Sequence, residues 1–168
     1  MLQVYDRVVG GIMAAVRLVC IAQATALFII VVVAVVARYV FGQAVSWTEE
    51  VPRYLLIWIS FLGAAAGVAK REHVGFDILF NALPAPLRRS LGAGIGLLIL
   101  GFGWIVFRYG IVFVEDFGSD LMETIPYTNY WYYIAMPISG LLFMLFALKV
   151  IADALLGRGE SSVGQSVD

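Results

Sequence analysis

The sequence has few of the residues on which catalytic or cofactor chemistry usually depends. One cysteine, Cys20, and one histidine, His73, occur in 168 residues, and only 14% of the residues are charged. A membrane haem usually takes two axial imidazoles and a thiol oxidoreductase takes paired cysteines, so neither group fits this chain. A glycine-rich phosphate loop and a nucleophile elbow are also missing. We therefore expect no enzyme activity, no cofactor and no metal site.

What the sequence has instead is long apolar stretches, which charged residues separate from one another. Uncharged residues run through positions 18–37, 54–69, 91–107 and 124–148. About 20 apolar residues cross a hydrocarbon core of roughly 30 Å, and in lipid a helix satisfies its own backbone polar groups. The sequence thus predicts an all-α integral membrane protein with four transmembrane helices. Extending the shorter stretches into their flanks places the helices at about residues 14–37, 48–69, 90–114 and 127–150.

The remaining length and charge restrict the domain organisation. Four helices fill most of the chain, so residues 1–156 are predicted to form one membrane domain, without a separate soluble domain. Residues 157–168 are polar and rich in glycine and serine, which predicts a disordered tail. A net charge of −1 does not suggest binding to nucleic acid.

Basic residues are distributed unevenly among the expected loops, which predicts an orientation. Eight of them lie on one side, at the N-terminal flank, the loop after helix two and the C-terminal end: Arg7, Arg17, Lys70, Arg71, Arg88, Arg89, Lys149 and Arg158. The first loop region offers only Arg38 and Arg53. The positive-inside rule therefore places both termini in the cytoplasm. The last external loop carries acidic residues instead: Glu115, Asp116, Asp120 and Glu123.

In the middle of the predicted spans the sequence offers no carboxylate to carry a proton, although a transporter that works alone usually has a charged group at mid-membrane. One charged residue, Arg108, does lie inside the third predicted helix, about two turns below its expected outer end. Its long side chain can reach towards the interface, and Glu115 lies seven residues on, on almost the same helical face. Two alternatives are open here: an arginine at the interface beside an acidic neighbour, or a contact with a partner helix.

Small residues recur at the spacing that lets membrane helices pack closely. Gly63 and Gly67 form one such pair, and Gly92 and Gly96 form another. Such pairs bring helix backbones together in lipid, where close packing replaces the hydrophobic driving force. The pairs fit contacts within this chain or contacts with another protein.

The first external loop and the start of the second helix carry the densest polar pattern. Thr48 is suited to cap the helix, and Glu49 and Glu50 fall in its first turn, where acids favour the helix dipole. Glu49 and Arg53 are four residues apart and can form an ion pair. This pattern fits either a capped helix start or a site for docking a partner.

Further along, Glu72, His73 and Asp77 fall in the loop after the second helix. We interpret them as a hydrogen-bonding set that orders this loop rather than as metal ligands, because one histidine with scattered acids is weak evidence for a metal.

These elements together resemble a known family. The chain reads R-Y-V-F at residues 38–41, W-T-E-E-V-P-R at residues 47–53, a glycine at position 63 and E-H-V-G-F-D at residues 72–77. The ordered set is similar to the small membrane subunit of the tripartite ATP-independent periplasmic (TRAP) transporters, often called DctQ-like. The resemblance is strongest over residues 38–84, about a quarter of the chain.

The resemblance implies a subunit of a secondary transporter in the cytoplasmic membrane of a bacterium or archaeon. A periplasmic binding protein would deliver an organic anion, such as a carboxylate or sugar acid, in a transient contact. A large multi-helix subunit would move the anion with an ion gradient, and this chain would brace that subunit. The residues then expected at the partner interface are Arg38, Trp47, Glu49, Glu50, Arg53, Gly63, Gly67 and Arg108.

Two other functions fit the composition. A self-contained, oligomeric four-helix transporter or channel would use Arg108 and the outer acids, and the purified chain alone would transport. A structural anchor of a respiratory or enzyme complex would instead co-purify with soluble redox subunits. The TRAP subunit is the prediction that accounts for both the ordered motifs and the apolar membrane interior.

Overall fold

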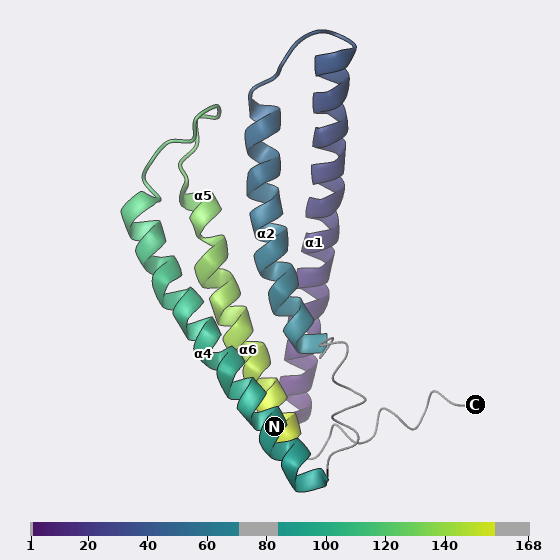
Figure 1. Ribbon diagram of the computed structural model, residues 1–168, viewed down its shortest axis with the longest axis vertical. Coiled ribbons are helices and arrows are strands. Elements are labelled where there is room, and N and C mark those ends of the chain that lie inside the picture. The colour runs from purple at the N-terminus through teal and green to yellow at the C-terminus, as the bar shows by residue number, and fades with distance from the viewer. Residues whose placement is uncertain (1, 71–83, 157–168) are drawn as a thin grey trace, which may run out of the picture.

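The computed structural model describes residues 2–70 and 84–156. The regular secondary structure of this part is helical, with one isolated β-bridge between Leu121 and Thr128. The helices in Figure 1 are α1 (Leu2–Tyr39), α2 (Trp47–Lys70), α4 (Ala85–Phe117), α5 (Tyr130–Tyr133) and α6 (Ala135–Leu156). Glu72, His73, Asp77 and the segment 157–168 lie outside the described residues.

Four stretches of the described chain are long and apolar enough to cross a membrane. They are Arg7–Tyr39, Trp47–Ala69, Pro86–Phe117 and Tyr130–Leu156, the last of which combines α5 and α6. The prediction of an all-α chain with four membrane-spanning stretches is confirmed at this level.

The helices form two antiparallel hairpins, α1 with α2 and α4 with α6 (Figure 1). The hairpins contact each other through α2 and α6. They converge at the end that holds the N-terminus and separate towards the opposite end, where residues 40–46 and 118–129 connect the helices. We call this opposite end the loop end.

The buried core lies where the hairpins converge. It consists of Val9 from α1, Ala65 and Val68 from α2, and Phe143 and Phe146 from α6. Towards the loop end α1 loses these neighbours, and no residue in its most apolar stretch is buried. In a membrane such a surface contacts lipid chains, which are as apolar as the side chains, so its exposure carries no hydrophobic penalty.

Helix α1 begins at Leu2, twelve residues before the predicted start at residue 14. The charges near the N-terminus suggested a flanking segment, but apolar residues there recur at helical spacing. Val9 and Val16 are 1% and 8% exposed, and the Tyr5 hydroxyl donates a hydrogen bond of 2.9 Å to the Leu145 carbonyl of α6. Packing of this stripe against the other hairpin extends the helix beyond its membrane-spanning part.

The α4–α6 hairpin is packed through glycines. A Cβ atom at Gly103 would lie 2.9 Å from the Phe143 Cβ, and one at Gly110 would lie 2.8 Å from the Pro137 nitrogen. A Cβ atom at Gly96 would collide with Ile151 in the same way. These glycines are seven residues apart, so they form one stripe along α4. Only residues without a side chain let the two backbones approach this closely.

The fourth span is not the single helix predicted at residues 127–150. It consists of α5 and α6, which are separated at Ile134. Pro137 has no N–H, so the Tyr133 carbonyl loses its usual partner four residues on, and the helix is interrupted there.

The third span also differs from its predicted bounds of 90–114. Helix α4 starts directly after Pro84, with Pro86 in its first turn. It ends at Phe117 and is capped by Gly118, whose N–H donates to the Val114 carbonyl at 2.9 Å. Proline in the first turn is favourable because its missing N–H has no partner there in any helix.

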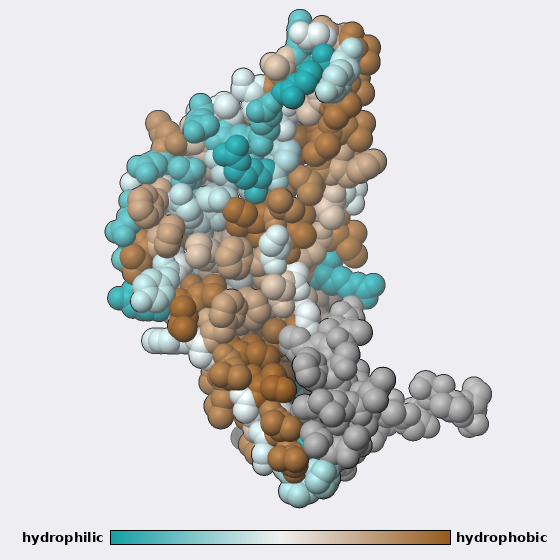
Figure 2. Space-filling view, in the orientation of Figure 1, coloured by the Kyte–Doolittle hydropathy of each residue, from teal (hydrophilic) through white to brown (hydrophobic). Residues whose placement is uncertain are grey.

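The surface has two characters. Figure 2 shows hydrophilic residues over the upper part of the molecule, where residues 118–129 and the start of α2 lie, and hydrophobic residues below them and along α1. The loop end is therefore the polar end of this face, and it is where the sequence placed most of its candidate residues.

Candidate docking site at the loop end

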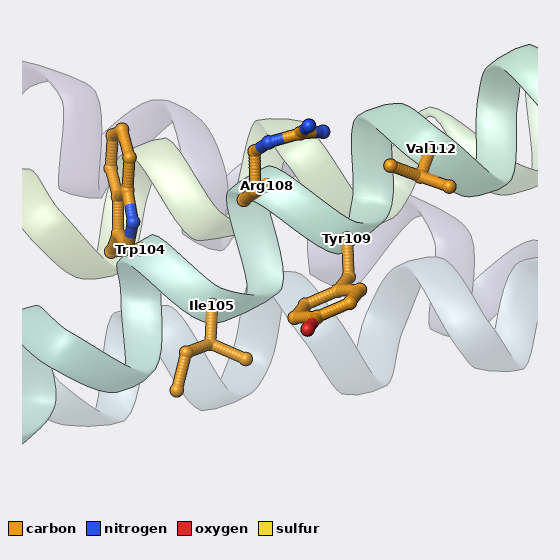
Figure 3. A pocket seen from close by; sticks show the side chains of 5 residues that line it. All are labelled: Trp104, Ile105, Arg108, Tyr109 and Val112. Atoms are coloured by element: carbon orange, nitrogen blue, oxygen red, sulfur yellow. The ribbon is translucent and has the colours of Figure 1, made fainter.

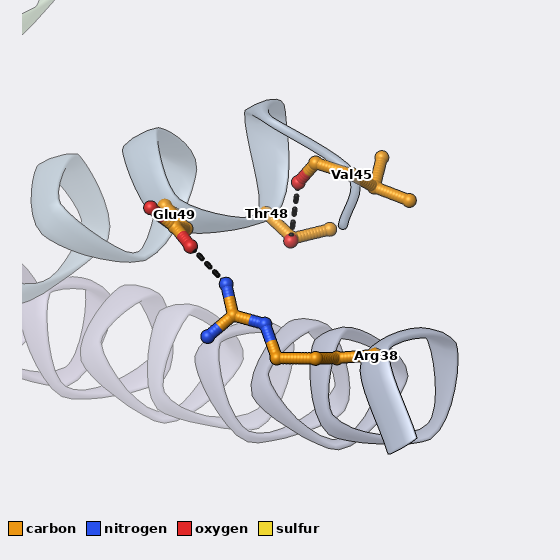
Figure 4. A network of polar contacts seen from close by, with 4 residues as sticks. All are labelled: Arg38, Val45, Thr48 and Glu49. Carbon is orange, nitrogen blue, oxygen red and sulfur yellow. Dashed lines mark hydrogen bonds and ion pairs between the residues drawn. The ribbon is translucent and has the colours of Figure 1, made fainter. Parts of the chain in front are cut away.

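An ion pair joins the two helices of the first hairpin at the loop end. Arg38, in the last turn of α1, donates to the Glu49 carboxylate in the first turn of α2 (Figure 4). The predicted partner of Glu49, Arg53, is not the one it takes, because the hairpin brings Arg38 closer. The two side chains are 54% and 64% exposed, and ion pairs this exposed contribute little to stability in water.

The chain reversal before α2 does not use the predicted cap. The Thr48 hydroxyl donates 2.6 Å back to the Val45 carbonyl instead of accepting a bond from the helix (Figure 4). Helix α2 starts at Trp47, two residues before Glu49, which would be the first helical residue after a Thr48 cap. In the same connection Gly42 has a φ angle of 65°, a left-handed conformation that glycine adopts without strain.

Glu50 is the most enclosed charged residue of the site, with only 5% of its surface exposed. One carboxylate oxygen accepts hydrogen bonds from the Tyr54 hydroxyl at 2.5 Å and from the Glu123 N–H at 2.9 Å. The other accepts from the Thr124 N–H at 2.8 Å and from the Thr124 hydroxyl. Four donors thus satisfy the two oxygens of the carboxylate.

Through these bonds Glu50 holds residues 118–129 against the start of α2. The segment is also folded on itself, since the Met122 N–H donates to the Tyr127 carbonyl and the Asn129 N–H donates to the Asp120 carbonyl, both at 2.8 Å. Glu50, predicted as a surface contact, therefore faces the chain's own loop. It shapes the loop end and offers little surface to a partner.

Aromatic residues join α2 to α5 beside this carboxylate. The Tyr54 and Tyr132 rings meet edge to face with centroids 4.8 Å apart. The Trp58 indole N–H donates 2.9 Å to the Trp131 carbonyl. Through these contacts the aromatic residues connect the two hairpins.

A pocket of about 370 Å³ lies among these residues. Its lining comes from α1, α2, the 118–129 segment and α5: Gln23, Val51, Tyr54, Leu55, Trp58, Met122, Ile125, Tyr127, Trp131 and Tyr132. The Gln23 Oε1 atom is enclosed and has no hydrogen-bond partner among the described residues.

Gly63 and Gly67 lie on a face of α2 that no other described residue covers. A Cβ atom at either position would have no atom within 4 Å. Leu56, Ser60 and Ala64 are exposed on the same face. The α4 glycines pack against α6 within this chain. Gly63 and Gly67 do not take part in that contact and remain open to a contact outside the described residues.

Arg108 lies on α4, away from the α2 face. Together with Trp104, Ile105, Tyr109 and Val112 it lines a shallow pocket of about 310 Å³ on the surface (Figure 3). The sequence suggested an ion pair with Glu115. No ion pair or hydrogen bond joins Arg108 to Glu115, or to any other residue within 2–70 and 84–156.

Several residues of the site were missed by the sequence reasoning. Thr124 and Trp131 lie 74 and 73 residues from their partners Glu50 and Trp58, and no local pattern links them. The α4 stripe of Gly96, Gly103 and Gly110 did have a signal, because a glycine every seventh residue returns to the same helical face. In the described ranges no group of three or more metal-ligating side chains is close enough to hold a metal ion.

Comparison with known proteins identifies the family. The family described as the DctQ component of the tripartite ATP-independent periplasmic transporters matches residues 27–157. A putative TRAP transporter small permease protein of Haemophilus influenzae is 41% identical over 70 residues, which cover 42% of this chain and 44% of that protein.

Two longer alignments agree. The C4-dicarboxylate TRAP transporter small permease protein DctQ of Rhodobacter capsulatus is 33% identical over 124 residues, covering 71% of this chain and 53% of that protein. The sialic acid TRAP transporter permease protein SiaT of H. influenzae is 27% identical over 119 residues, covering 71% of this chain but 19% of that protein. The chain thus matches about a fifth to a half of the length of these relatives. It belongs to the DctQ component family of the tripartite ATP-independent periplasmic transporters.

Proposed function

We propose that this chain is the small membrane subunit of a TRAP secondary transporter and braces a large multi-helix transport subunit. Its role is assembly and support rather than catalysis. The observation that carries the proposal is the open α2 face at Gly63 and Gly67, within a chain whose family is the DctQ component. This chain aligns with only 19% of a sialic acid TRAP transporter permease. The rest of that permease is much larger than this chain, which supports a large partner subunit.

The partner contact follows from the packing of the two hairpins. The α4–α6 hairpin uses its glycines internally, whereas Gly63, Ala64 and Gly67 remain available for a helix of the large subunit. Small residues allow such a helix to approach closely, and in lipid this approach is the main source of association energy. Arg53 and Trp47 are exposed near the loop-end part of the same helix and extend the proposed interface.

The ion pair and the buried carboxylate have different parts in this interface. Arg38 and Glu49 form an ion pair between the ends of α1 and α2, and both side chains remain exposed enough to contact a partner. Glu50 acts indirectly, because it holds the 118–129 segment in place. Arg108, which the sequence also assigned to the interface, lies on α4 and is separate from the α2 face.

We place the chain in a bacterial or archaeal cytoplasmic membrane with both termini in the cytoplasm, on the distribution of Lys and Arg. The loop end then faces the periplasm. Its acidic residues, Glu115, Asp116, Asp120 and Glu123, form a negative surface that a periplasmic binding protein can contact transiently. Salt screens such exposed charges, so they steer the encounter more than they stabilise the complex.

The transported compound in this proposal is an organic anion, a carboxylate or a sugar acid. The names of two relatives, which refer to C4-dicarboxylate and sialic acid, agree with that class. No acidic residue lies in the middle of a described span of this chain, so the gradient-coupled step is assigned to the large subunit.

The proposal is tested by purifying the tagged chain from its native membranes in mild detergent and identifying what accompanies it. We expect a large polytopic membrane protein in a one-to-one ratio. A homo-oligomer alone would contradict the proposal in favour of a self-contained transporter or channel. Soluble redox subunits would contradict it in favour of an anchor for a respiratory complex.

A further inference from the structure

The outward face of α4 carries a cation for which the described part of the chain supplies no anion. Arg108 is exposed, lies within the candidate membrane span Pro86–Phe117 and bonds to no other described residue. Figure 3 shows Trp104, Arg108 and Val112 on one side of α4, with Ile105 and Tyr109 on the adjacent side. A guanidinium at membrane depth is stable only with water or an anionic partner, so the position calls for a ligand from outside the described chain.

The depth of Arg108 places it near the edge of the hydrocarbon core. Helix α4 has 33 residues, which at 1.5 Å per residue makes about 50 Å, roughly 20 Å more than the hydrocarbon core. If the excess is shared by both ends, each end extends about 10 Å beyond the core. Arg108, nine residues before Phe117, is about 13 Å from the helix end. Its side chain therefore reaches the boundary where lipid phosphates lie.

The neighbours of Arg108 favour lipid over a protein helix. Trp104 and Tyr109 are 58% and 62% exposed, and Ile105 is 55% exposed. Exposed tryptophan and tyrosine are typical of the membrane interface, where an apolar ring contacts acyl chains and a polar edge meets the headgroups. The side chains beside Arg108 are large, whereas a packed membrane helix prefers small residues such as those on the α2 face.

We propose that Arg108, with Trp104 and Tyr109, forms a binding site for the phosphate of a phospholipid headgroup in the leaflet at the loop end. The guanidinium is planar and matches two phosphate oxygens at once, which makes arginine the preferred residue for such contacts. The pocket of about 310 Å³ beside it takes the glycerol region of the lipid. This site does not depend on the transport role or on the α2 interface.

The experiment is native mass spectrometry of the full chain in detergent, titrated with dioleoylphosphatidylglycerol. We expect Arg108→Gln to weaken binding of the first lipid about tenfold, the size expected for losing one charge-assisted contact. Arg108→Lys should retain most of the affinity because it keeps the charge. Arg17→Gln is the matched control, since it removes an exposed arginine from α1, far from the loop end, and it should leave the affinity unchanged.

Two further arms distinguish the sources of the bound anion. Dioleoylglycerol, which lacks the phosphate, should not bind at this site, and inorganic phosphate at millimolar concentration should not displace the phospholipid. If Arg108→Gln fails to fold, Trp104→Leu replaces it and should weaken the same binding event to a smaller extent. Equal losses in Arg108→Gln and Arg17→Gln would overturn the proposal. Unchanged lipid affinity, with loss of a co-purifying membrane protein instead, would overturn it in favour of a partner carboxylate.

Discussion

The two hairpins of this chain use their glycines in opposite ways. In α4 and α6, Gly103 and Gly110 lie against the facing backbone, and a Cβ atom there would collide with Phe143 or Pro137. In α1 and α2, Gly63 and Gly67 have no neighbour within 4 Å. Small residues at helical spacing therefore pack against the facing helix in one hairpin, and no described residue covers them in the other. In the proposed function, a larger subunit covers this open face of the α1–α2 hairpin.

The largest expected effect comes from filling the internal glycine stripe. Gly103→Leu places a side chain against Phe143 and the Gly140 carbonyl, which lies 3.1 Å from a Cβ at this position. Because backbone atoms cannot move aside, we expect destabilisation near the upper limit for overpacking, about 3 kcal/mol. Thermal unfolding of the purified chain in detergent measures it.

Gly101→Leu is the matched control for this prediction. Gly101 lies two residues away on the same helix, and a Cβ atom there has nothing within 4 Å. We expect unchanged stability or a gain of up to about 1 kcal/mol, because leucine favours a helix more than glycine does. Equal destabilisation by the two substitutions would mean that the α4–α6 hairpin does not depend on this stripe.

The next largest effect is expected on binding of the large membrane subunit and not on the stability of the chain. Gly63→Leu and Gly67→Leu should leave the unfolding temperature of the isolated chain unchanged or slightly raised, for the same reason as Gly101→Leu. Recovery of the large membrane subunit in a pull-down should fall by about tenfold or more, as for the loss of roughly 1.4 kcal/mol of binding free energy. Full recovery from both variants would remove the α2 face from the interface.

A smaller effect is expected from the buried carboxylate. Glu50→Gln removes the charge and one of the two acceptor oxygens that face Thr124 and Glu123. The 118–129 segment should then open more often, so limited proteolysis should cut it several-fold faster. Glu49→Gln is the matched control, one residue away and exposed. Equal cleavage rates in the two variants would show that Glu50 does not hold the segment.

The smallest effect is expected from the ion pair between α1 and α2. Arg38→Gln, Glu49→Gln and the double variant should each change the free energy of unfolding by no more than about 1 kcal/mol, because both side chains are more than half exposed. A double-mutant cycle in detergent isolates the pair energy. A coupling energy of several kcal/mol would contradict this prediction, because it would mean that the two side chains are shielded from solvent.

The sequence was sufficient for the features that depend on local composition. Long uncharged runs predicted four spans, since a helix that crosses a membrane needs little besides length and apolar side chains. The extended start of α1 was missed because it depends on Val9 joining a core shared with the other hairpin and on the hydrogen bond from Tyr5 to Leu145. The interruption at Ile134 was signalled by Pro137, whose missing N–H acts on the turn before it.

The candidate site was harder to derive, because its contacts join segments far apart in the sequence. Glu50 was recognised as a special residue of the first turn, but its partners Glu123 and Thr124 follow from how the hairpins sit together. Similarly, the sequence predicted Arg53 as the partner of Glu49, whereas the hairpin brings Arg38 to it. Spacing in the sequence gives the face of a helix, and only the fold gives what that face meets.

Site-directed cross-linking tests the central claim most directly. The chain has one cysteine, Cys20, so Cys20→Ala provides a background for a single cysteine at Gly63 or at the control position Gly101. In native membranes Gly63→Cys should cross-link to a second, larger membrane protein, and Gly101→Cys should not. Cross-links only between two copies of this chain, or equal yields at the two positions, would contradict the account.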